Sequence, residues 1–251
     1  CPLRNNKKIE PYGSITPVVY MLGEASGREE IKEGRQFVGA SGQLLRRHVP
    51  DRWSDDRLLR WNNCLKARPP ENRTPTAVEL ACCRSFLEDD IVATKPAAIF
   101  GFGAVPLGWF GLAEAGITTW AGRYVPVRVR NKAGETHTCW YFPFMHPSYV
   151  LRKVNEEWSA PRLGYASEIE FAFHVHLERA FALVDDIGQL GPPVVHTRDM
   201  AMDGIEVVRT YDDQALARVL RFIEDMYDEK IVGFDYETNA LRPYNNGTKL
   251  L

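Results

Sequence analysis

The sequence predicts an α/β protein in which helices cover both faces of a parallel sheet. Short runs of β-branched and aromatic residues, typical of buried strands, recur through the first two thirds of the chain. Segments of helical periodicity separate these runs, and glycine or proline follows most of them. Alternating strands and helices are typical of a parallel sheet covered on both faces. We therefore expect a three-layer α/β/α fold with a four-stranded parallel sheet.

Four segments are expected to form this sheet: residues 17–22, 58–64, 97–102 and 139–145. Residues 124–130 alternate apolar and basic side chains and then reach a turn at 131–134. That pattern predicts a hairpin with one basic face.

Three segments are expected to be helices: residues 41–48, 76–92 and 168–184. Thr76 can cap the second helix, and Glu79 follows it at the spacing of a capping box. Apolar side chains of this helix recur near helical spacing, at Val78, Cys82, Phe86, Leu87 and Ile91.

The chemically interesting residues follow the predicted strands. Gly23 and Glu24 end the first strand, residues 63–72 follow the second, and His146 follows the fourth. In such sheets, ligands bind at the carboxyl ends of the strands. We therefore expect these groups to meet at one edge, where the helix amides near Ser41 would favour an anion.

Charge and turn residues divide the chain into two modules. Residues 1–160 carry 22 Lys and Arg against 17 Asp and Glu, a charge of +5, whereas residues 161–251 carry 9 against 16, a charge of −7. Such asymmetry indicates separate modules. We expect one domain over 1–187, a linker over 188–203 that includes Gly-Gln-Leu-Gly-Pro-Pro, and the start of a second domain over 204–251.

The cysteines and apolar runs indicate the compartment. The five cysteines are an odd number, and no secretory signal precedes them. No apolar run approaches the roughly 20 residues that span a bilayer. We expect a cytoplasmic protein that is not secreted. The ends at Cys1 and Leu251 suggest a fragment of a longer chain.

Four ordered blocks carry a family resemblance. They are Gly-Glu-Ala-x-Gly from Gly23 with Gly-x-x-Phe-Val-Gly-x-x-Gly-x-Leu-Leu from Gly34, then residues 63–73, 83–87 and 146–148. Together they resemble the thermophile-type (family 4) uracil-DNA glycosylases over roughly the first 155 residues. Ser26 and Gln36 depart from this family, which usually has proline at both positions, and this leaves the shape of the loop open.

The resemblance implies excision of uracil from DNA, for which the base must be flipped out of the stack. In this family Phe37 would stack on the base, Asn63 would read the uracil edge, and His146 would donate a hydrogen bond to the uracil oxygen. Each residue also has an alternative, purely structural interpretation. Phe37 could belong to the core, Asn63 could lie in a turn or cap a helix, and His146 could be a structural histidine.

The remaining site residues follow from the same blocks. Glu24 would align or activate water, and Glu30 would assist, unless Glu30 belongs to a solvated loop. Gly23 would let the substrate approach the backbone closely. The other expected contacts to substrate or DNA backbone are Asn72, Ser148, Ser41, Arg73 and Arg152.

The family holds a 4Fe–4S cluster with four cysteines. Cys1 and Cys83 match two of them, and a third would precede Cys1. The remaining position is Ala67, which cannot bind iron; Cys64 or Cys82 would have to substitute. Because such clusters normally need four thiolates, we expect the cluster to be lost or rearranged.

Asp235 and Glu237 lie two residues apart, so on a strand both carboxylates face one side and could bind Mg²⁺. Residues 234–241 resemble the first motif of the 3′–5′ exonucleases attached to DNA polymerase I-type enzymes. A solvated strand end is the ordinary alternative. Further carboxylates are missing, so we expect this part to be incomplete and to use Mg²⁺ only in the full-length protein.

The two resemblances thus imply a uracil-DNA glycosylase as the N-terminal part of a phage or bacterial DNA polymerase, in the cytoplasm of a bacterial or phage-infected cell. Its partners would be uracil-containing DNA and the downstream exonuclease and polymerase domains. The main alternative is a non-catalytic module that senses uracil or binds template. An α/β hydrolase has little support, because Gly-x-Ser-x-Gly is absent from the sequence.

Overall fold

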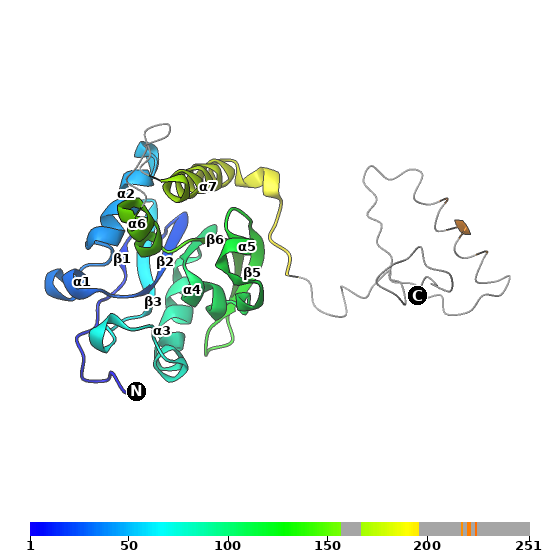
Figure 1. The fold of residues 1–251 in the computed structure, drawn as a ribbon. Coiled ribbons are helices and arrows are strands. Elements are labelled where there is room, and N and C mark those ends of the chain that lie inside the picture. The colour runs from blue at the N-terminus through cyan, green and yellow to red at the C-terminus, as the bar shows by residue number, and fades with distance from the viewer. Residues whose placement is uncertain (157–166, 196–216, 218–219, 222–223, 225–251) are drawn as a thin grey trace, which may run out of the picture. The chain divides into compact units, whose positions relative to one another are not determined.

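A computed structural model describes residues 1–156, 167–195, 217, 220, 221 and 224. The chain divides into two units, Cys1–Val195 and His196–Leu251. Figure 1 shows the fold of the first unit. Apart from residues 217, 220, 221 and 224, the second unit lies outside the described residues. The predicted metal ligands Asp235 and Glu237 are therefore also outside them.

The first unit is built on a six-stranded sheet with the order β1-β3-β2-β4-β6-β5. The strands are β1 (Tyr12–Gly13), β2 (Val19–Ala25), β3 (Leu59–Leu65), β4 (Ala98–Phe102), β5 (Val125–Arg130) and β6 (Thr136–Phe144). The four central strands are parallel, as the sequence predicts. β5 and β6 form the predicted hairpin, so the sheet has an antiparallel edge there. The other edge, β1, was not predicted, because two residues are too short to show a pattern.

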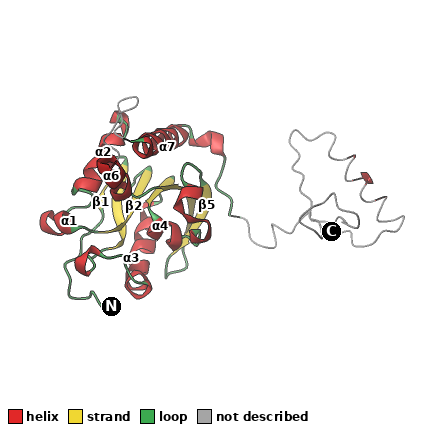
Figure 2. Ribbon diagram, viewed as in Figure 1, coloured by secondary structure: helices red, strands yellow, loops and turns green. Residues whose placement is uncertain are grey.

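Helices cover both faces of the sheet (Figure 2). They are α1 (Arg28–Glu33), α2 (Ala40–His48), α3 (Ala77–Thr94), α4 (Ala104–Trp109), α5 (Gly116–Trp120), α6 (Pro147–Glu156) and α7 (Glu168–Asp185). The predicted helices are α2, α3 and α7; the other four were missed because α1, α4 and α5 are short and α6 begins with proline. No helix in the described part is long and apolar enough to cross a membrane.

The alternation of side chains along β2 creates two cores. Val19 and Met21 face a core shared with α2, α6 and α7, whereas Tyr20 and Leu22 face one shared with α3 and α4. Successive side chains of a strand point to opposite faces, so a strand that is buried on both sides reads as a continuous apolar run. The first core is rich in aromatic rings, among them Phe100, Phe102, Phe142, Phe144, Phe173 and Phe181.

The apolar residues of α3 do not all point inward. Cys83, Leu87 and Ile91 are buried, but Val78 is 61% exposed and Phe86 is 59% exposed. Positions 83, 87 and 91 lie one helical turn apart on the face against the sheet, whereas position 86 falls beside that face and position 78 falls opposite it. Part of the predicted apolar stripe of this helix is therefore solvent-exposed.

The predicted capping box at the start of α3 is present. The Thr76 Oγ1 accepts the Glu79 N–H at 3.3 Å, and the Glu79 Oε2 accepts the Thr76 N–H at 2.9 Å. Arg73 adds two hydrogen bonds to the Glu79 carboxylate, at 2.9 and 2.7 Å. Chiefly because of Arg73, the pKa of Glu79 falls to about 2 from its ordinary 4.5.

We expect Glu79→Gln to lower the free energy of unfolding at neutral pH. The ionised Glu79 stabilises the fold above pH 4.5, its value in the unfolded chain, and this contribution is lost as the pH falls toward the folded value of about 2. The stability difference between the variant and the parent should therefore shrink over that interval in urea titrations. The control is Glu88→Gln, which removes a more exposed partner of Arg84 on the same helix. A difference that does not change with pH would contradict the assignment.

Candidate active site

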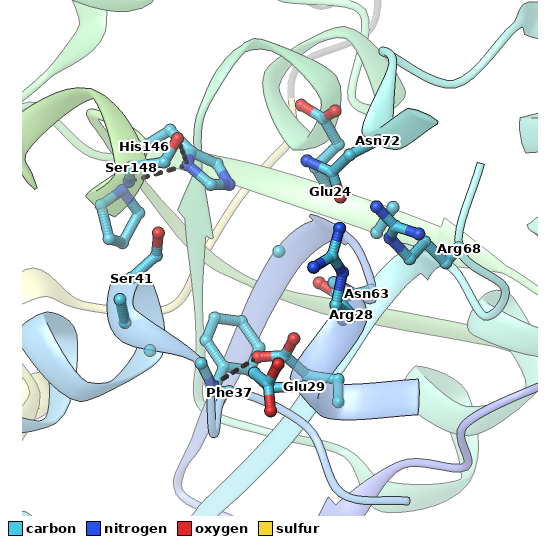
Figure 3. A pocket seen from close by; sticks show the side chains of 18 of the residues that line it. Glu24, Arg28, Glu29, Phe37, Ser41, Asn63, Arg68, Asn72, His146 and Ser148 are labelled. Carbon is cyan, nitrogen blue, oxygen red and sulfur yellow. Dashed lines mark hydrogen bonds between the residues drawn. The ribbon is translucent and has the colours of Figure 1, made fainter. Parts of the chain in front are cut away.

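A cavity of about 600 Å³ opens at the carboxyl edge of the parallel strands. Side chains reach it from the end of β2, the segment from α1 to α2, the end of β3 with its following loop, and the start of α6 (Figure 3). The structure brings together in its wall all eleven glycosylase-site residues proposed from the sequence: Gly23, Glu24, Glu30, Phe37, Ser41, Asn63, Asn72, Arg73, His146, Ser148 and Arg152.

Phe37 is fixed through both its ring and its backbone. Its ring centroid lies 5.1 Å from that of Trp61 and 6.3 Å from that of Phe102. The Arg46 Nε donates to the Phe37 carbonyl at 3.3 Å, and the Arg46 guanidinium lies 4.1 Å from the Trp61 ring centroid. The backbone of Phe37 is left-handed, with φ of 56°. The ring is therefore a rigid wall of the cavity as well as part of the core.

Two glycines allow this arrangement. A Cβ on Gly23 would lie 2.2 Å from the Asn63 Oδ1 and 2.8 Å from the Phe37 Cζ. A Cβ on Gly42 would lie 2.3 Å from the Phe37 carbonyl oxygen. Both distances to oxygen are far inside van der Waals contact, so a side chain at either position would displace the residues of the wall.

Asn63 lies within β3 and is 5% exposed, so it caps neither a helix nor a turn. Its Nδ2 donates to the Gln36 Oε1 at 2.6 Å. Its Oδ1 lies against Gly23 on the cavity side. Asn63 therefore offers a hydrogen-bond acceptor at the base of the cavity.

The two glutamates have different surroundings. Glu24 is half-buried at the end of β2, and burial raises the pKa of its carboxyl group. Glu30 is 9% exposed, and its Oε1 accepts the N–H groups of Val38 at 3.1 Å and Gly39 at 2.8 Å. Glu30 is therefore not a solvated loop residue; it ties α1 to the start of α2. These two amides precede those near Ser41, which we expected to favour an anion.

His146 is held as a neutral hydrogen-bond donor. Burial, and secondarily the charge of Arg152, lower its pKa to about 4. The His146 Nδ1 accepts the Ser148 N–H at 3.1 Å and lies 2.7 Å from the Ser148 Oγ. Because a backbone N–H can act only as a donor, the proton of the neutral ring resides on Nε2. The imidazole points toward the open centre of the site in Figure 3.

Two arginines in the wall, Arg28 and Arg68, were not proposed from the sequence as site residues. The Nε of Arg68 is buried without a hydrogen-bond partner in the described part of the chain. Arg73, by contrast, is already paired with Glu79. Arg68 stands between Asn63 and Asn72 in one of the motif blocks, and that position is the signal that could have identified it.

The cysteines do not fit a four-thiolate cluster. Cys1 is exposed, whereas Cys83 is buried in a small apolar cluster with Leu3, Leu65 and Ala67. Ala67 is 2% exposed and presents a methyl group where a ligand would be needed. Among the described residues, no three histidine, cysteine or acidic side chains are grouped so that they could hold a metal ion.

Comparisons with known proteins agree with this geometry. Residues 10–165 match the family described as the uracil DNA glycosylase superfamily, so the chain belongs to that superfamily. A type-4 uracil-DNA glycosylase of Thermotoga maritima is 33% identical over 160 residues, which cover 62% of this chain and 79% of the relative. Within the superfamily, this match places the chain in the type-4 family.

Two further type-4 uracil-DNA glycosylases are also similar to the chain. The protein of Archaeoglobus fulgidus is 29% identical, with 64% of this chain and 82% of the relative covered. The protein of Pyrobaculum aerophilum is 36% identical, with 42% of this chain and 55% of the relative covered.

Gly23→Ala should abolish ligand binding in this cavity, because the added methyl group must displace Asn63 or Phe37. Gly108→Ala is the matched control, since a Cβ there would meet the Ala113 Cβ, its nearest neighbour outside the backbone of its own helix, at an ordinary 3.7 Å. Binding of oligonucleotides with and without uracil, measured beside thermal unfolding, checks this. Unchanged uracil-dependent binding by Gly23→Ala would contradict the packing described above.

Proposed function

We propose that the domain hydrolyses the N-glycosidic bond between uracil and deoxyribose in DNA. The observation that carries this proposal is one cavity that joins a rigid aromatic ring, a buried amide acceptor, a neutral imidazole donor and a carboxylate with a raised pKa. The names of the type-4 relatives support it. These groups are of the kinds that could hold a base and stabilise its departure.

The base would enter the cavity flipped out of the DNA stack. Phe37 would stack against one face of uracil, and the Asn63 Oδ1 would accept the N3–H of the base. Cytosine has a lone pair at N3 and would leave this buried acceptor unpaired, which is the kind of mismatch that gives strong discrimination. The bare backbone of Gly23 would leave room for the edge of the base.

Cleavage moves the bonding electrons onto the base and leaves oxocarbenium character on the sugar. The His146 Nε2–H would donate to the uracil oxygen on which negative charge develops. The Glu24 carboxylate would stabilise the positive sugar and accept a proton from the water that attacks C1′. Glu30 would act indirectly, because its contacts with Val38 and Gly39 hold the loop that carries Phe37.

The cations around the cavity would hold the DNA backbone. Arg28, Arg68 and Arg152 line the cavity, and the Nε of Arg68 has no hydrogen-bond partner among the residues that the structure describes. Side chains of this type contact phosphates and fix the register without reading sequence. Asn72, Ser41 and Ser148 would supply neutral contacts at the same rim. The pairing of Arg73 with Glu79 makes Arg73 a weaker phosphate ligand than the sequence suggested.

Release of uracil from a single-uracil oligonucleotide, single- or double-stranded, tests the proposal. We expect Glu24→Gln and His146→Gln each to lower the rate by roughly 10²–10³-fold, the range for a lost base or oxyanion donor. Glu33→Gln, an exposed position of α1, is the matched control and should act as the parent does. Parent activity should fall on the acid side as Glu24 protonates, at a pH above the ordinary carboxyl pKa of 4.5.

If the parent protein released no uracil, the proposal that the domain is an enzyme would be wrong. If the parent then bound uracil-containing DNA more tightly than thymine-containing DNA, the domain would be a uracil-sensing or template-binding module. If both substitutions left the rate of uracil release unchanged, Glu24 and His146 would not be the catalytic residues.

We also propose that the domain works without a four-cysteine iron–sulfur cluster. Ala67 and its apolar neighbours support this, and no catalytic step above uses the cluster. Protein purified without oxygen should contain far less than four iron atoms per chain and lack cluster absorbance, and Cys83→Ala should retain uracil release. Stoichiometric iron that is lost in Cys83→Ala would overturn the proposal.

The link to a polymerase rests on sequence. Residues 204–251 are proposed to begin a 3′–5′ exonuclease domain of a DNA polymerase, on the strength of Asp235, Glu237 and their neighbours. In a chain that continues past residue 251, this would give Mg²⁺-dependent degradation of 3′ ends that Asp235→Ala abolishes. Uracil release should not depend on that metal or on that substitution.

A further inference from the structure

Gln36 occupies a buried position beside the cavity. It lies between α1 and α2 and is 0% exposed. Its Nε2 lies 3.3 Å from the Ile9 carbonyl oxygen and 3.5 Å from that of Glu10. Its Oε1 accepts the Asn63 Nδ2 at 2.6 Å and the Ser26 Oγ hydroxyl at 3.3 Å. The side-chain amide therefore links the N-terminal segment to the asparagine in the cavity wall.

These contacts determine how both amides are oriented. The carbonyls of Ile9 and Glu10 can only accept hydrogen bonds, so they require the NH₂ group of Gln36 to face them. The Oε1 of Gln36 then faces Asn63 and, as an acceptor, requires the Asn63 NH₂ group in turn. The Asn63 Oδ1 is left facing Gly23 and the cavity.

We propose that Gln36 is a positioning residue that sets base selectivity by holding the Asn63 amide with its oxygen toward the cavity. The proposal rests on the proposed uracil-excising function. A fixed acceptor matches the N3–H of uracil and opposes the N3 lone pair of cytosine. An Asn63 amide that is free to rotate could present its NH₂ group instead. That group would donate to N3 of cytosine, so cytosine would also fit the site.

The alternative is that Gln36 only fills space. Gln36→Met separates the two roles, because methionine is similar in length but has no amide oxygen to accept from Asn63. Gln43→Met is the matched control. The Gln43 Nε2 donates to the Val38 carbonyl at 3.0 Å, so this substitution removes a side-chain amide hydrogen bond near the cavity that does not involve Asn63.

The first measurement is hydrogen exchange of the Asn63 side-chain amide by ¹⁵N NMR. Its resonances are identified by their loss in Asn63→Asp. In the parent, the proton that is bonded to Gln36 should be protected, and Gln36→Met should speed its exchange roughly tenfold or more, in line with loss of a buried hydrogen bond. Gln43→Met should leave it protected. Equal exchange in the parent and Gln36→Met would overturn the positioning role, whether or not the domain proves to be an enzyme.

The second measurement is the ratio of kcat/KM for uracil to that for cytosine in otherwise identical oligonucleotides. Gln36→Met should reduce this ratio roughly tenfold or more, because the buried acceptor is no longer fixed. In an Asn63→Ala background the same substitution should not change the ratio further. An unchanged ratio in Gln36→Met, or an equal reduction in both backgrounds, would make Gln36 a packing residue.

The two failures are distinguishable. A parent that releases no uracil refutes the proposed function, and the exchange measurement still decides the role of Gln36. A parent that releases uracil with a selectivity unaffected by Gln36→Met refutes the inference alone.

Discussion

The absence of a side chain at Gly23 is the constraint on which the cavity depends. Its Cα hydrogens occupy the space between the Asn63 amide and the Phe37 ring, where a Cβ would overlap both. Phe37 can then rest on Trp61, and Asn63 can reach Gln36. The Phe37 ring and the Asn63 amide are thus held side by side by backbone packing before any ligand is present. Such preorganisation reduces the entropy lost when a ligand binds.

The face of β3 opposite the cavity is also anchored. The Asn62 Oδ1 accepts the Asn63 N–H at 2.8 Å, and the Asn62 Nδ2 donates to the Tyr20 hydroxyl at 2.8 Å. That hydroxyl donates to Asp90 at 2.5 Å, and Arg60 pairs with the same carboxylate. Because neighbouring residues of a strand face opposite sides, Asn62 secures the strand to α3 while Asn63 serves the cavity. Buried polar groups that are satisfied in this way rigidify a site.

Much of this arrangement could be predicted from the sequence. The apolar runs give the four central strands, and their carboxyl ends identify the cavity wall from Gly23 to His146. Periodicity could not reveal β1, which is two residues long, or the exposure of Phe86, which depends on how α3 is rotated against the sheet. The roles of Glu30 and Gln36 depend on which amides and carbonyls the fold places beside them, and composition or spacing carries no such information.

The cavity wall joins segments from opposite ends of the domain. His146 reaches it only after β6 has paired with β4, and Gly23 lies on β2 at the other side of β4. The parallel unit formed by β2, α2 and β3 carries Gly23, Phe37 and Asn63, but it lacks the imidazole of His146. During synthesis, the cavity is therefore completed only when β6 has joined the sheet, and contacts of such high sequence separation form slowly. A nascent chain that ends before His146 therefore carries the residues of the aromatic wall and the buried amide without the imidazole donor.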